Sequence, residues 1–468
     1  MSKRRSRFGN REGKGGRRSS SPSRPLRPPR DPAKDGATNP QLLPATSRLV
    51  SIEKPIYGGA FLAHLEGKAV FVPLALPGEE AQVRLAEEKR HYATAEVEEI
   101  VSAAPERVAA RCRHFGACGS CHYQHAGYAS QLEFKRAILR ETLERGGVGA
   151  PGDVAVLAGD PWGYRNRIRL AFDAEGRPGY RGRRSHGVIP IGECPIAAPL
   201  LVRAALAAAE TVRSLPSRQR PIEIALFCDA EETALLASVM AGGGAKGWFE
   251  DFAGSLAAKI PETKGVERLA AGAKGQAPRR VAQRGATSLL YRAAGFAYHV
   301  DFGAFFQVNR WLLDALVDAV VKRGTGRKLA WDLFAGVGLF ARQLADQFDQ
   351  VAAVEAAEAA TESLQHNLTG TRARAVRATT LGFLRGMGSV ERPDFIVVDP
   401  PRAGLGAETT ALLGQIAAPE LAYVSCDPAT LARDLRALLA AGYTIENITL
   451  ADLFPQTFHI ESVVRLRR

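Results

Sequence analysis

The sequence contains no run of 18 consecutive apolar residues and no apolar stretch near its start of the kind that forms a secretory signal. The first absence argues against a membrane-spanning helix, and the second predicts a cytoplasmic protein. Cysteine is scarce, with 6 in 468 residues, and cytoplasmic thiols stay reduced unless they bind metal, so no disulfide framework is expected. Hydrophobic residues make up 46% of the chain, which is ample for buried cores, and the length indicates about two to four domains. We expect a monomer without membrane association.

The first 43 residues have almost no apolar side chains. Residues 1–40 hold 12 Lys or Arg against 3 Asp or Glu, so this stretch supplies most of the net charge of +13. Because such a composition cannot bury enough apolar surface to offset its ordering entropy, residues 1–43 are predicted to be a disordered basic tail. A tail of this kind attracts nucleic-acid phosphates without sequence preference, and a solvated leader that only aids solubility is the alternative.

Residues 44–104 show five short strand patterns separated by turn signals. The turns are marked by Gly58-Gly59, Glu66-Gly67 and Pro77-Gly78, and the expected strands span residues 48–52, 60–65, 68–72, 80–86 and 91–101. Five short strands at this spacing predict a small barrel of the OB type, a common scaffold for binding oligonucleotides. A barrel without a ligand is the alternative.

Three cysteines share one loop, with the spacing Cys-x5-Cys-x2-Cys at Cys112, Cys118 and Cys121. Cys194, which follows a strand and a glycine turn, is the candidate for a fourth ligand. Structural zinc sites usually take two short pairs of ligands, so three clustered cysteines and one distant cysteine favour a [4Fe–4S] cluster over zinc. Cys228 lies in an apolar strand and is expected to be a core residue.

Residues 105–300 are predicted to form a central domain that binds RNA. Residues 131–145 have the pattern of an amphipathic helix, and residues 162–172 that of a strand dense in arginine. Arginines interleaved with aromatic residues suit phosphate contact and base stacking, while an ordinary charged sheet face is the alternative. The arginines in question include Arg165, Arg167, Arg169, Arg181, Arg183 and Arg184, and the nearby His114, His122 and His125 are expected to be solvated loop residues.

Residues 301–468 have the pattern of a Rossmann-like α/β domain. Asp332 ends an apolar strand and precedes a glycine-rich turn with Gly336 and Gly338, and Glu355 ends the next strand 23 residues after Asp332. The glycines let the backbone approach a nucleotide, and a carboxylate at the second position accepts ribose hydroxyls. This combination favours S-adenosylmethionine (SAM). NAD is the competing ligand, but only two of its three expected glycines are present.

Two further strand ends carry polar residues. One strand ends in Asp399-Pro400-Pro401-Arg402, a rigid turn suited to a position beside the SAM methyl group. Cys426 lies between an apolar strand at 421–424 and a helix predicted over 429–439, where a helix N-terminus lowers the pKa of a thiol. A small buried cysteine is the alternative at this position. Glu461 follows in a last strand, with His459 close to it in the sequence.

These features resemble the RNA 5-methyluridine methyltransferases, and the residues 44–104 resemble a TRAM domain. With the barrel and the four cysteines, the chain resembles most the branch of the family that acts on large-subunit ribosomal RNA. The blocks that carry the resemblance are Phe305-Phe306-Gln307-Val308-Asn309, Asp332-Leu333-Phe334, Asp399-Pro400-Pro401-Arg402-Ala403-Gly404, Ser425-Cys426-Asp427-Pro428-Ala429-Thr430-Leu431-Ala432-Arg433-Asp434 and Phe454-Pro455 with His459-Ile460-Glu461-Ser462.

The resemblance implies methylation of uridine C5 in RNA, most of all 23S rRNA, with SAM as methyl donor. It implies that Cys426 is the nucleophile and Glu461 the base. The residues that it implies as SAM contacts are Gln307, Phe334, Glu355 and Asp399. The family often has a polar residue directly after the second motif glycine, where this chain has Leu339. A transfer-RNA uridine, an amino-group methyltransferase that uses Asp399-Pro400-Pro401-Arg402, and a non-catalytic RNA-binding protein are the alternatives.

Overall fold

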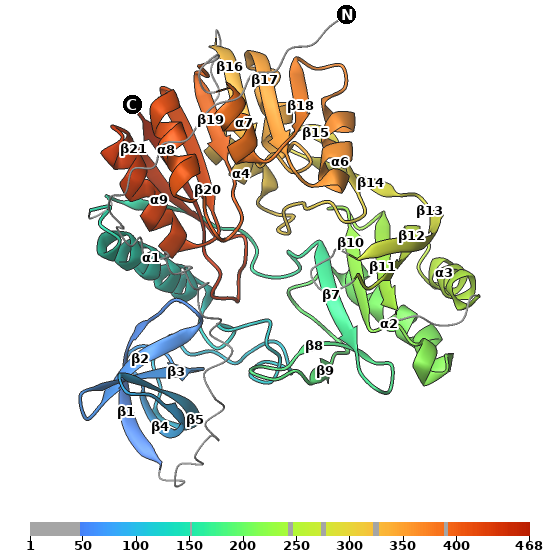
Figure 1. Ribbon diagram of the computed structural model, residues 1–468. Helices are drawn as coiled ribbons and strands as arrows, with labels where there is room; N and C mark the ends of the chain where they lie inside the picture. Colours follow the sequence, from blue (N-terminus) through green and yellow to red (C-terminus); the bar gives the residue numbers. More distant parts are fainter. Residues whose placement is uncertain (1–46, 150–151, 242–246, 273–277, 322–326, 388–391) are drawn as a thin grey trace, which may run out of the picture. The chain divides into compact units, whose positions relative to one another are not determined.

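The computed structural model describes residues 47–149, 152–241, 247–272, 278–321, 327–387 and 392–468 (Figure 1). The predicted basic tail, residues 1–43, lies outside this part of the chain. None of the helices within the described ranges has both the length and the apolar character needed to cross a membrane.

The five strands predicted for the N-terminal part are confirmed, and they close into a barrel with the order β1-β2-β3-β5-β4. Alternate residues point inward, so that Val50, Phe61, Val72 and Val83 are buried in one apolar core. Closure leaves this small sheet without a free edge. The strands are β1 (Arg48–Pro55), β2 (Ala60–Leu65), β3 (Lys68–Pro73), β4 (Glu80–Glu88) and β5 (Tyr92–Ser102).

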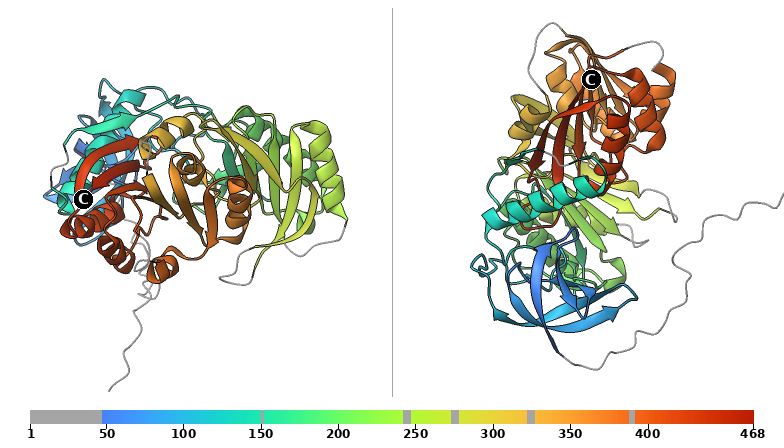
Figure 2. Two further views of the ribbon diagram at one scale, coloured as in Figure 1. Left: turned by 90° about the horizontal axis from the view of Figure 1, so that it is seen from above. Right: turned by 90° about the vertical axis from the view of Figure 1, so that its left-hand side faces the viewer.

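A seven-stranded sheet follows in the chain, with the order β13-β12-β11-β10-β7-β8-β9. Helices α2 (Pro199–Ser214) and α3 (Trp248–Lys259) pack on it and share its apolar core (Figure 2). The strands are β7 (Arg167–Phe172), β8 (Pro178–Arg181), β9 (Val188–Pro190), β10 (Glu223–Cys228), β11 (Leu235–Ala241), β12 (Thr263–Ala270) and β13 (Arg279–Gly285), and a short 3-10 helix spans Ser217–Gln219. Cys228 is fully buried at the end of β10, as predicted.

The strand expected over residues 162–172 begins only at Arg167, so the first half of that prediction is wrong. The preceding backbone pairs with other loops instead of with the sheet. The Arg165 amide donates to the Ile196 carbonyl at 2.9 Å and the Asn166 amide donates to the Val308 carbonyl at 3.0 Å. These bonds take the place of a sheet ladder and join the central part of the chain to the segment before the third sheet.

The third sheet has eight strands in the order β18-β17-β16-β19-β20-β22-β21-β6. Its neighbouring strands are parallel, except that β22 runs antiparallel to both β20 and β21. The strands are β16 (Arg327–Leu333), β17 (Phe348–Glu355), β18 (Ala373–Arg377), β19 (Phe395–Val398), β20 (Glu420–Ser425), β21 (Thr444–Ala451), β22 (Glu461–Arg467) and β6 (Val154–Leu157), and the separate hairpin consists of β14 (Ser288–Ala293) and β15 (Phe296–Asp301).

Helices cover both faces of the eight-stranded sheet, which is the doubly wound arrangement expected for residues 301–468 (Figure 1). One apolar core lies under three of the helices, and a second core on the other face includes the other three and α1. The helices of the first core are α4 (Leu313–Val320), α5 (Leu339–Leu344) and α6 (Glu358–Leu368). Those of the second core are α7 (Thr380–Met387), α8 (Ala407–Ile416), α9 (Pro428–Ala440) and α1 (Tyr128–Arg145).

Two elements from the segment predicted as a central domain are part of the third sheet or pack against it. Strand β6 pairs in parallel with β21, and helix α1 contacts both β1 of the barrel and α9. A buried ion pair fastens α1 in place, because Lys135 Nζ lies 2.6 Å from Asp452 Oδ1 and both side chains are fully buried. Helix α1 therefore links the barrel to helix α9 and to the segment that follows β21.

Candidate active site

Cys426 lies on the turn between β20 and α9, as predicted. The carboxyl end of β20 is at Ser425, and Asp427 caps the helix by accepting hydrogen bonds from the backbone amides of Ala429 and Thr430, both at 3.0 Å. Pro428 occupies the first turn of α9, where its missing amide proton costs nothing. The Cys426 thiol is therefore held half-buried at the carboxyl edge of the sheet.

The antiparallel direction of β22 brings Glu461 to the same edge. Ser425 pairs with Ser462 across the two strands, so the first residue of β22 lies beside the last residues of β20. Asp399 follows directly after β19, the neighbour of β20 on the other side. Three residues that the sequence places far apart, Cys426, Glu461 and Asp399, thus meet at one site.

Burial, reinforced by the charges of Glu461 and then Asp399, raises the pKa of the Cys426 thiol to about 11, while Arg402 opposes this shift. The expectation that the helix N-terminus makes this thiol more acidic is therefore wrong, because desolvation of the thiolate and two nearby carboxylates outweigh it. Burial also raises the pKa of Asp399 and, with the charge of Asp399 added, raises the pKa of Glu461 well above its ordinary value.

Arg402 brings a positive charge to this site, and side chains of α9 bind the backbone of the loop that carries it. Thr430 Oγ1 donates to the Arg402 carbonyl at 3.1 Å, and the Arg433 guanidinium donates to the Ala403 carbonyl at 2.8 Å. The side chain of Arg402 donates to His459 Nδ1 at 3.0 Å. Burial and the Arg402 charge lower the pKa of His459 to about 3, which keeps this imidazole neutral and able to accept that bond.

The glycine-rich turn after β16 has the shape of a nucleotide loop. Phe334 has a φ of 68°, unusual for an aromatic residue, and Gly338 has a φ of 92°. Glu355 ends β17, and its carboxylate accepts the Gly336 amide at 2.9 Å. Asp332 is buried under the turn, accepts the Ala341 amide at 2.8 Å, and has a pKa raised to about 8 by burial. Asp332 therefore supports the turn from below.

Two residues near this turn differ in what they offer a ligand. Leu339, at the position where the family often has a polar residue, is 6% exposed and packs into the core, so its side chain makes no polar contact. Gln307 is 7% exposed, and its amide nitrogen donates to Asp399 Oδ2 at 3.3 Å. This bond joins the segment before α4 to the carboxyl end of β19.

The four candidate ligand cysteines line one cavity beside the second sheet; they are Cys112, Cys118, Cys121 and Cys194. Burial raises the pKa of Cys121 to about 12 and also raises the pKa of Cys194. The charge of Arg165 opposes both shifts, so it favours the thiolate forms. Across the described residues, no group of three or more His, Cys, Asp or Glu side chains is arranged to hold a single metal ion.

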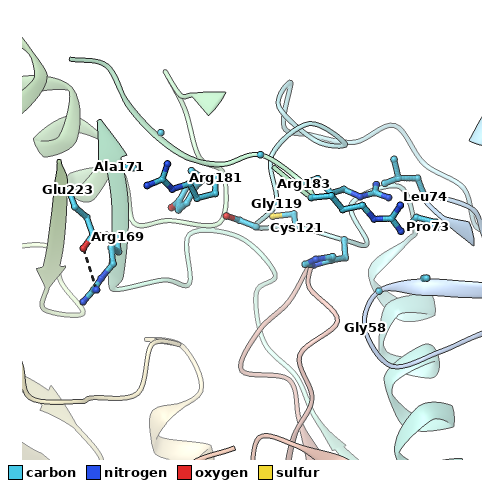
Figure 3. A pocket seen from close by; sticks show the side chains of 18 residues that line it. Gly58, Pro73, Leu74, Gly119, Cys121, Arg169, Ala171, Arg181, Arg183 and Glu223 are labelled. Atoms are coloured by element: carbon cyan, nitrogen blue, oxygen red, sulfur yellow. Dashed lines mark ion pairs between the residues drawn. The ribbon is translucent and has the colours of Figure 1, made fainter. Parts of the chain in front are cut away.

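A basic pocket of about 560 Å³ adjoins this cysteine loop (Figure 3). Arg181 and Arg183 line it, together with Gly119 and Cys121 of the loop and with the barrel residues around Gly58. Arg169 also lines it and pairs with Glu223 at 3.3 Å, the dashed contact in Figure 3. Four of the six arginines named from the sequence, Arg169, Arg181, Arg183 and Arg184, thus line one hollow surface. Arg165 and Arg167 line another cavity, where Arg167 donates to the Ala304 carbonyl at 2.8 Å.

The histidines of the cysteine loop are not all solvated. His125 is 3% exposed and its Nε2 lies 3.0 Å from the Ala75 carbonyl oxygen, so its ring is part of the packing against the barrel. Burial lowers the pKa of His125 and of His122, in each case to about 4. The prediction of solvated loop residues is therefore wrong for these two.

Sequence reasoning missed one residue of the site, Tyr57 of the barrel. Its hydroxyl lies 3.4 Å from Asp427 Oδ2, next to Cys426. Burial raises the pKa of Tyr57 to about 12, and the charges of Asp427 and Cys426 contribute in the same direction. The signal in the sequence is the motif Tyr57-Gly58-Gly59-Ala60, whose glycines predict a turn and which belongs to the resemblance to a TRAM domain.

Comparisons with known proteins agree with this arrangement. A family model described as tRNA (Uracil-5-)-methyltransferase matches residues 390–468, and the TRAM domain model matches residues 46–97. An RNA methyltransferase of uncharacterized function from Streptomyces avermitilis is 35% identical over 440 residues, covering 89% of this chain and 97% of the relative. The 23S rRNA (uracil(1939)-C(5))-methyltransferase RlmD of Chromohalobacter salexigens is 33% identical over 451 residues, covering 91% and 90%.

Among solved structures, the tRNA (uracil-54, C5)-methyltransferase of Pyrococcus abyssi, in complex with S-adenosyl-L-homocysteine, has the same fold. The TM-score is 0.72 at 24% identity, and the match covers 89% of this chain and 100% of that one. The fold, the geometry of the sheet edge and the full-length relatives agree. The chain therefore belongs to the SAM-dependent RNA (uracil-C5)-methyltransferase family and carries a TRAM domain in its N-terminal part.

Proposed function

We propose that this chain methylates C5 of one uridine in 23S rRNA through a covalent bond between Cys426 Sγ and C6 of the base. The observation that carries the proposal is the meeting of Cys426, Glu461 and Asp399 at the carboxyl edge of one sheet. The name of the C. salexigens relative, which acts on 23S rRNA, supports the choice of RNA.

Cys426 supplies the nucleophile because C5 of uracil is too weak a nucleophile on its own. When the thiolate adds to C6, the electron pair of the C5–C6 bond moves onto C5 and the O4 carbonyl, and C5 becomes the attacking atom. SAM, when bound, supplies an electrophilic methyl group that C5 takes with loss of the thioether. The raised pKa of Cys426 means that few thiolates exist at neutral pH, and Arg402 favours their formation.

Glu461 completes the reaction by removing the proton left on C5. Its pKa is raised by burial, so its carboxylate is a stronger base than a solvated one. Loss of the C5 proton pushes electrons back into the ring, the Sγ–C6 bond breaks, and Cys426 is released with the C5–C6 double bond restored. The uridine must leave its stack to reach this edge, at a cost of a few kcal/mol.

The SAM contacts belong to the same proposal. Glu355 would be the acceptor for the ribose hydroxyls, since it ends the strand next to the glycine-rich turn and its carboxylate lies against the Gly336 amide of that turn. Phe334, Gln307 and Asp399 would supply further contacts to bound SAM, and the bond from Gln307 to Asp399 Oδ2 at 3.3 Å holds two of them together. Leu339 contributes only its backbone, because its side chain is buried.

The RNA target is tested by mapping 5-methyluridine in total RNA from cells with and without this chain. We expect one 23S rRNA position to lose its methyl group in the deletion strain and to regain it on complementation. Loss from tRNA instead would move the target to the branch that the matching family model names. Loss of an amino-group methyl mark, with every 5-methyluridine unchanged, would contradict C5 chemistry altogether.

The four clustered cysteines hold a [4Fe–4S] cluster in this proposal. They line one cavity, and Arg165 lies close enough to stabilise the negative charge that four thiolates bring. Because the described residues hold no group of three or more His, Cys, Asp or Glu arranged for a metal ion, the proposal rests on the cysteine spacing in the sequence and on the cavity that the four share.

Iron and acid-labile sulfide analysis of protein purified without oxygen tests the cluster. We expect about four iron and four sulfide per chain. Replacing Cys194 by Ser should remove most of the iron, because it deletes one of the four ligands. Cys228→Ala is the matched control, since Cys228 is a core residue outside the cavity, and it should keep its iron. Stoichiometric zinc without sulfide would contradict the assignment.

A further inference from the structure

We propose that Tyr57 of the barrel is a positioning residue for methyl transfer, which braces both the Cys426 turn and the segment that leads to Glu461. The inference rests on the proposed function, since it assigns a role around the same reacting groups. It gives the TRAM domain a role in positioning the reacting groups, in addition to RNA binding.

The first contact reaches the Cys426 turn. The Tyr57 hydroxyl donates to Asp427 Oδ2 at 3.4 Å, while Oδ1 of the same carboxylate accepts the first backbone amides of α9. Asp427 is the residue directly after Cys426, so the barrel holds one oxygen of the helix cap and the helix holds the other. Rotation of the Asp427 side chain, and with it the Cys426 backbone, is thereby restrained.

The second contact reaches the segment before Glu461. The ring of Tyr57 meets the ring of Phe458 edge to face, with 5.5 Å between centroids and an interplanar angle of 89°. The rings of Phe458 and His459 are also in contact, with 4.4 Å between their centroids, and His459 accepts the hydrogen bond from Arg402. An edge-to-face pair such as Tyr57 and Phe458 stabilises its contact beyond the apolar area that it buries.

The barrel turn that presents Tyr57 is tightly seated. Gly59 has a φ of 86°, and a Cβ there would lie 2.8 Å from the His122 ring, so only glycine fits. The His122 ring packs against the Phe458 ring, with 4.6 Å between the two centroids. The backbone amide of His122 also donates to the Gln456 carbonyl at 2.8 Å. The barrel turn, the cysteine loop and the segment before Glu461 therefore form one packed unit around Tyr57.

The electrostatic surroundings agree with the geometry. Burial and then the charge of Asp427 raise the pKa of Tyr57, so its hydroxyl stays protonated and can donate to Asp427. Tyr57 has no need to touch the uridine in order to act. By fixing Cys426 and Glu461 relative to each other, it keeps the nucleophile and the base in register with C6 and C5, where small displacements cost large factors in rate.

Single-turnover methylation at saturating RNA and SAM tests the proposal, because it separates chemistry from RNA capture. We expect Tyr57→Ala to slow this rate by about 10-fold or more, and Tyr57→Phe, which keeps the ring against Phe458, to restore it to within about 3-fold of the wild-type chain. Tyr92→Ala is the matched control: Tyr92 is a barrel tyrosine, 37% exposed, that packs on Phe71. It should leave the rate unchanged.

A second readout needs no RNA. Removing the Tyr57 ring uncovers the turn, so alkylation of Cys426 by iodoacetamide, followed by mass spectrometry of its peptide, should become faster in Tyr57→Ala and stay unchanged in Tyr92→Ala. If Tyr57→Ala fails to fold, Tyr57→Leu carries the same two expectations. A Tyr57→Ala chain with the wild-type single-turnover rate, even if its RNA affinity drops, would overturn the proposal. A wild-type chain that forms no 5-methyluridine would instead overturn the proposed function.

Discussion

Replacing Cys426 by Ala should lower methyl transfer by at least about 10⁴-fold, because the described residues place no second thiol at this sheet edge to add to C6 and make C5 nucleophilic. Cys426 lies half-buried on the turn after β20, and the loss of its sulfur disturbs neither the Asp427 cap nor the core. SAM affinity, measured by calorimetry, should therefore stay close to that of the wild-type chain. Incorporation of labelled methyl groups into RNA measures the loss.

The companion variant is Glu461→Gln, which keeps the shape of the side chain and removes the base. Addition and methyl transfer should still occur, but the C5 proton is not removed and the Sγ–C6 bond persists. A band of RNA-linked protein on a denaturing gel should then accumulate in Glu461→Gln and be absent in the double variant with Cys426→Ala. Residual methylation by Cys426→Ala would refute the covalent mechanism, and a lack of the band would refute the role given to Glu461.

Replacing Lys135 by Met should destabilise the chain by roughly 3–5 kcal/mol, because it leaves the carboxylate of Asp452 buried without its partner. Both side chains are fully buried, and Lys135 Nζ also donates to the Phe454 carbonyl at 2.9 Å. The pair fastens α1 to the segment between β21 and Glu461. The midpoint of urea unfolding, followed by circular dichroism, measures the change.

Two variants sharpen this test. Lys54→Met breaks an ion pair with Glu141 on the same helix α1, but those side chains are 40% and 33% exposed, so the cost should stay below about 1 kcal/mol. The double variant Lys135→Met with Asp452→Leu should recover most of the lost stability, because a buried ion pair and apolar residues of similar volume are often equivalent. A Lys135→Met chain as stable as Lys54→Met would contradict the assigned burial penalty.

Local sequence patterns predicted the features that depend on neighbouring residues. The barrel strands follow from alternation and glycine turns, and the position of Cys426 follows from an apolar strand next to a proline-initiated helix. The first half of the strand predicted over residues 162–172 is wrong because the backbone there bonds to Ile196 and Val308, partners that lie far away in the sequence. Periodicity carries no information about such partners.

The sequence by itself determined which chemical groups are available: a thiol, carboxylates and an arginine at strand ends, three clustered cysteines with a distant fourth, and a glycine-rich turn. Only the tertiary structure decided how they meet. The antiparallel course of β22 brings Glu461 beside Cys426, and burial together with Glu461 and Asp399 sets the direction of the Cys426 pKa. The barrel brings Tyr57 to Asp427, although the two residues lie 370 positions apart in the sequence. Desolvation and contacts across the chain exist only after folding, so no local pattern encodes them.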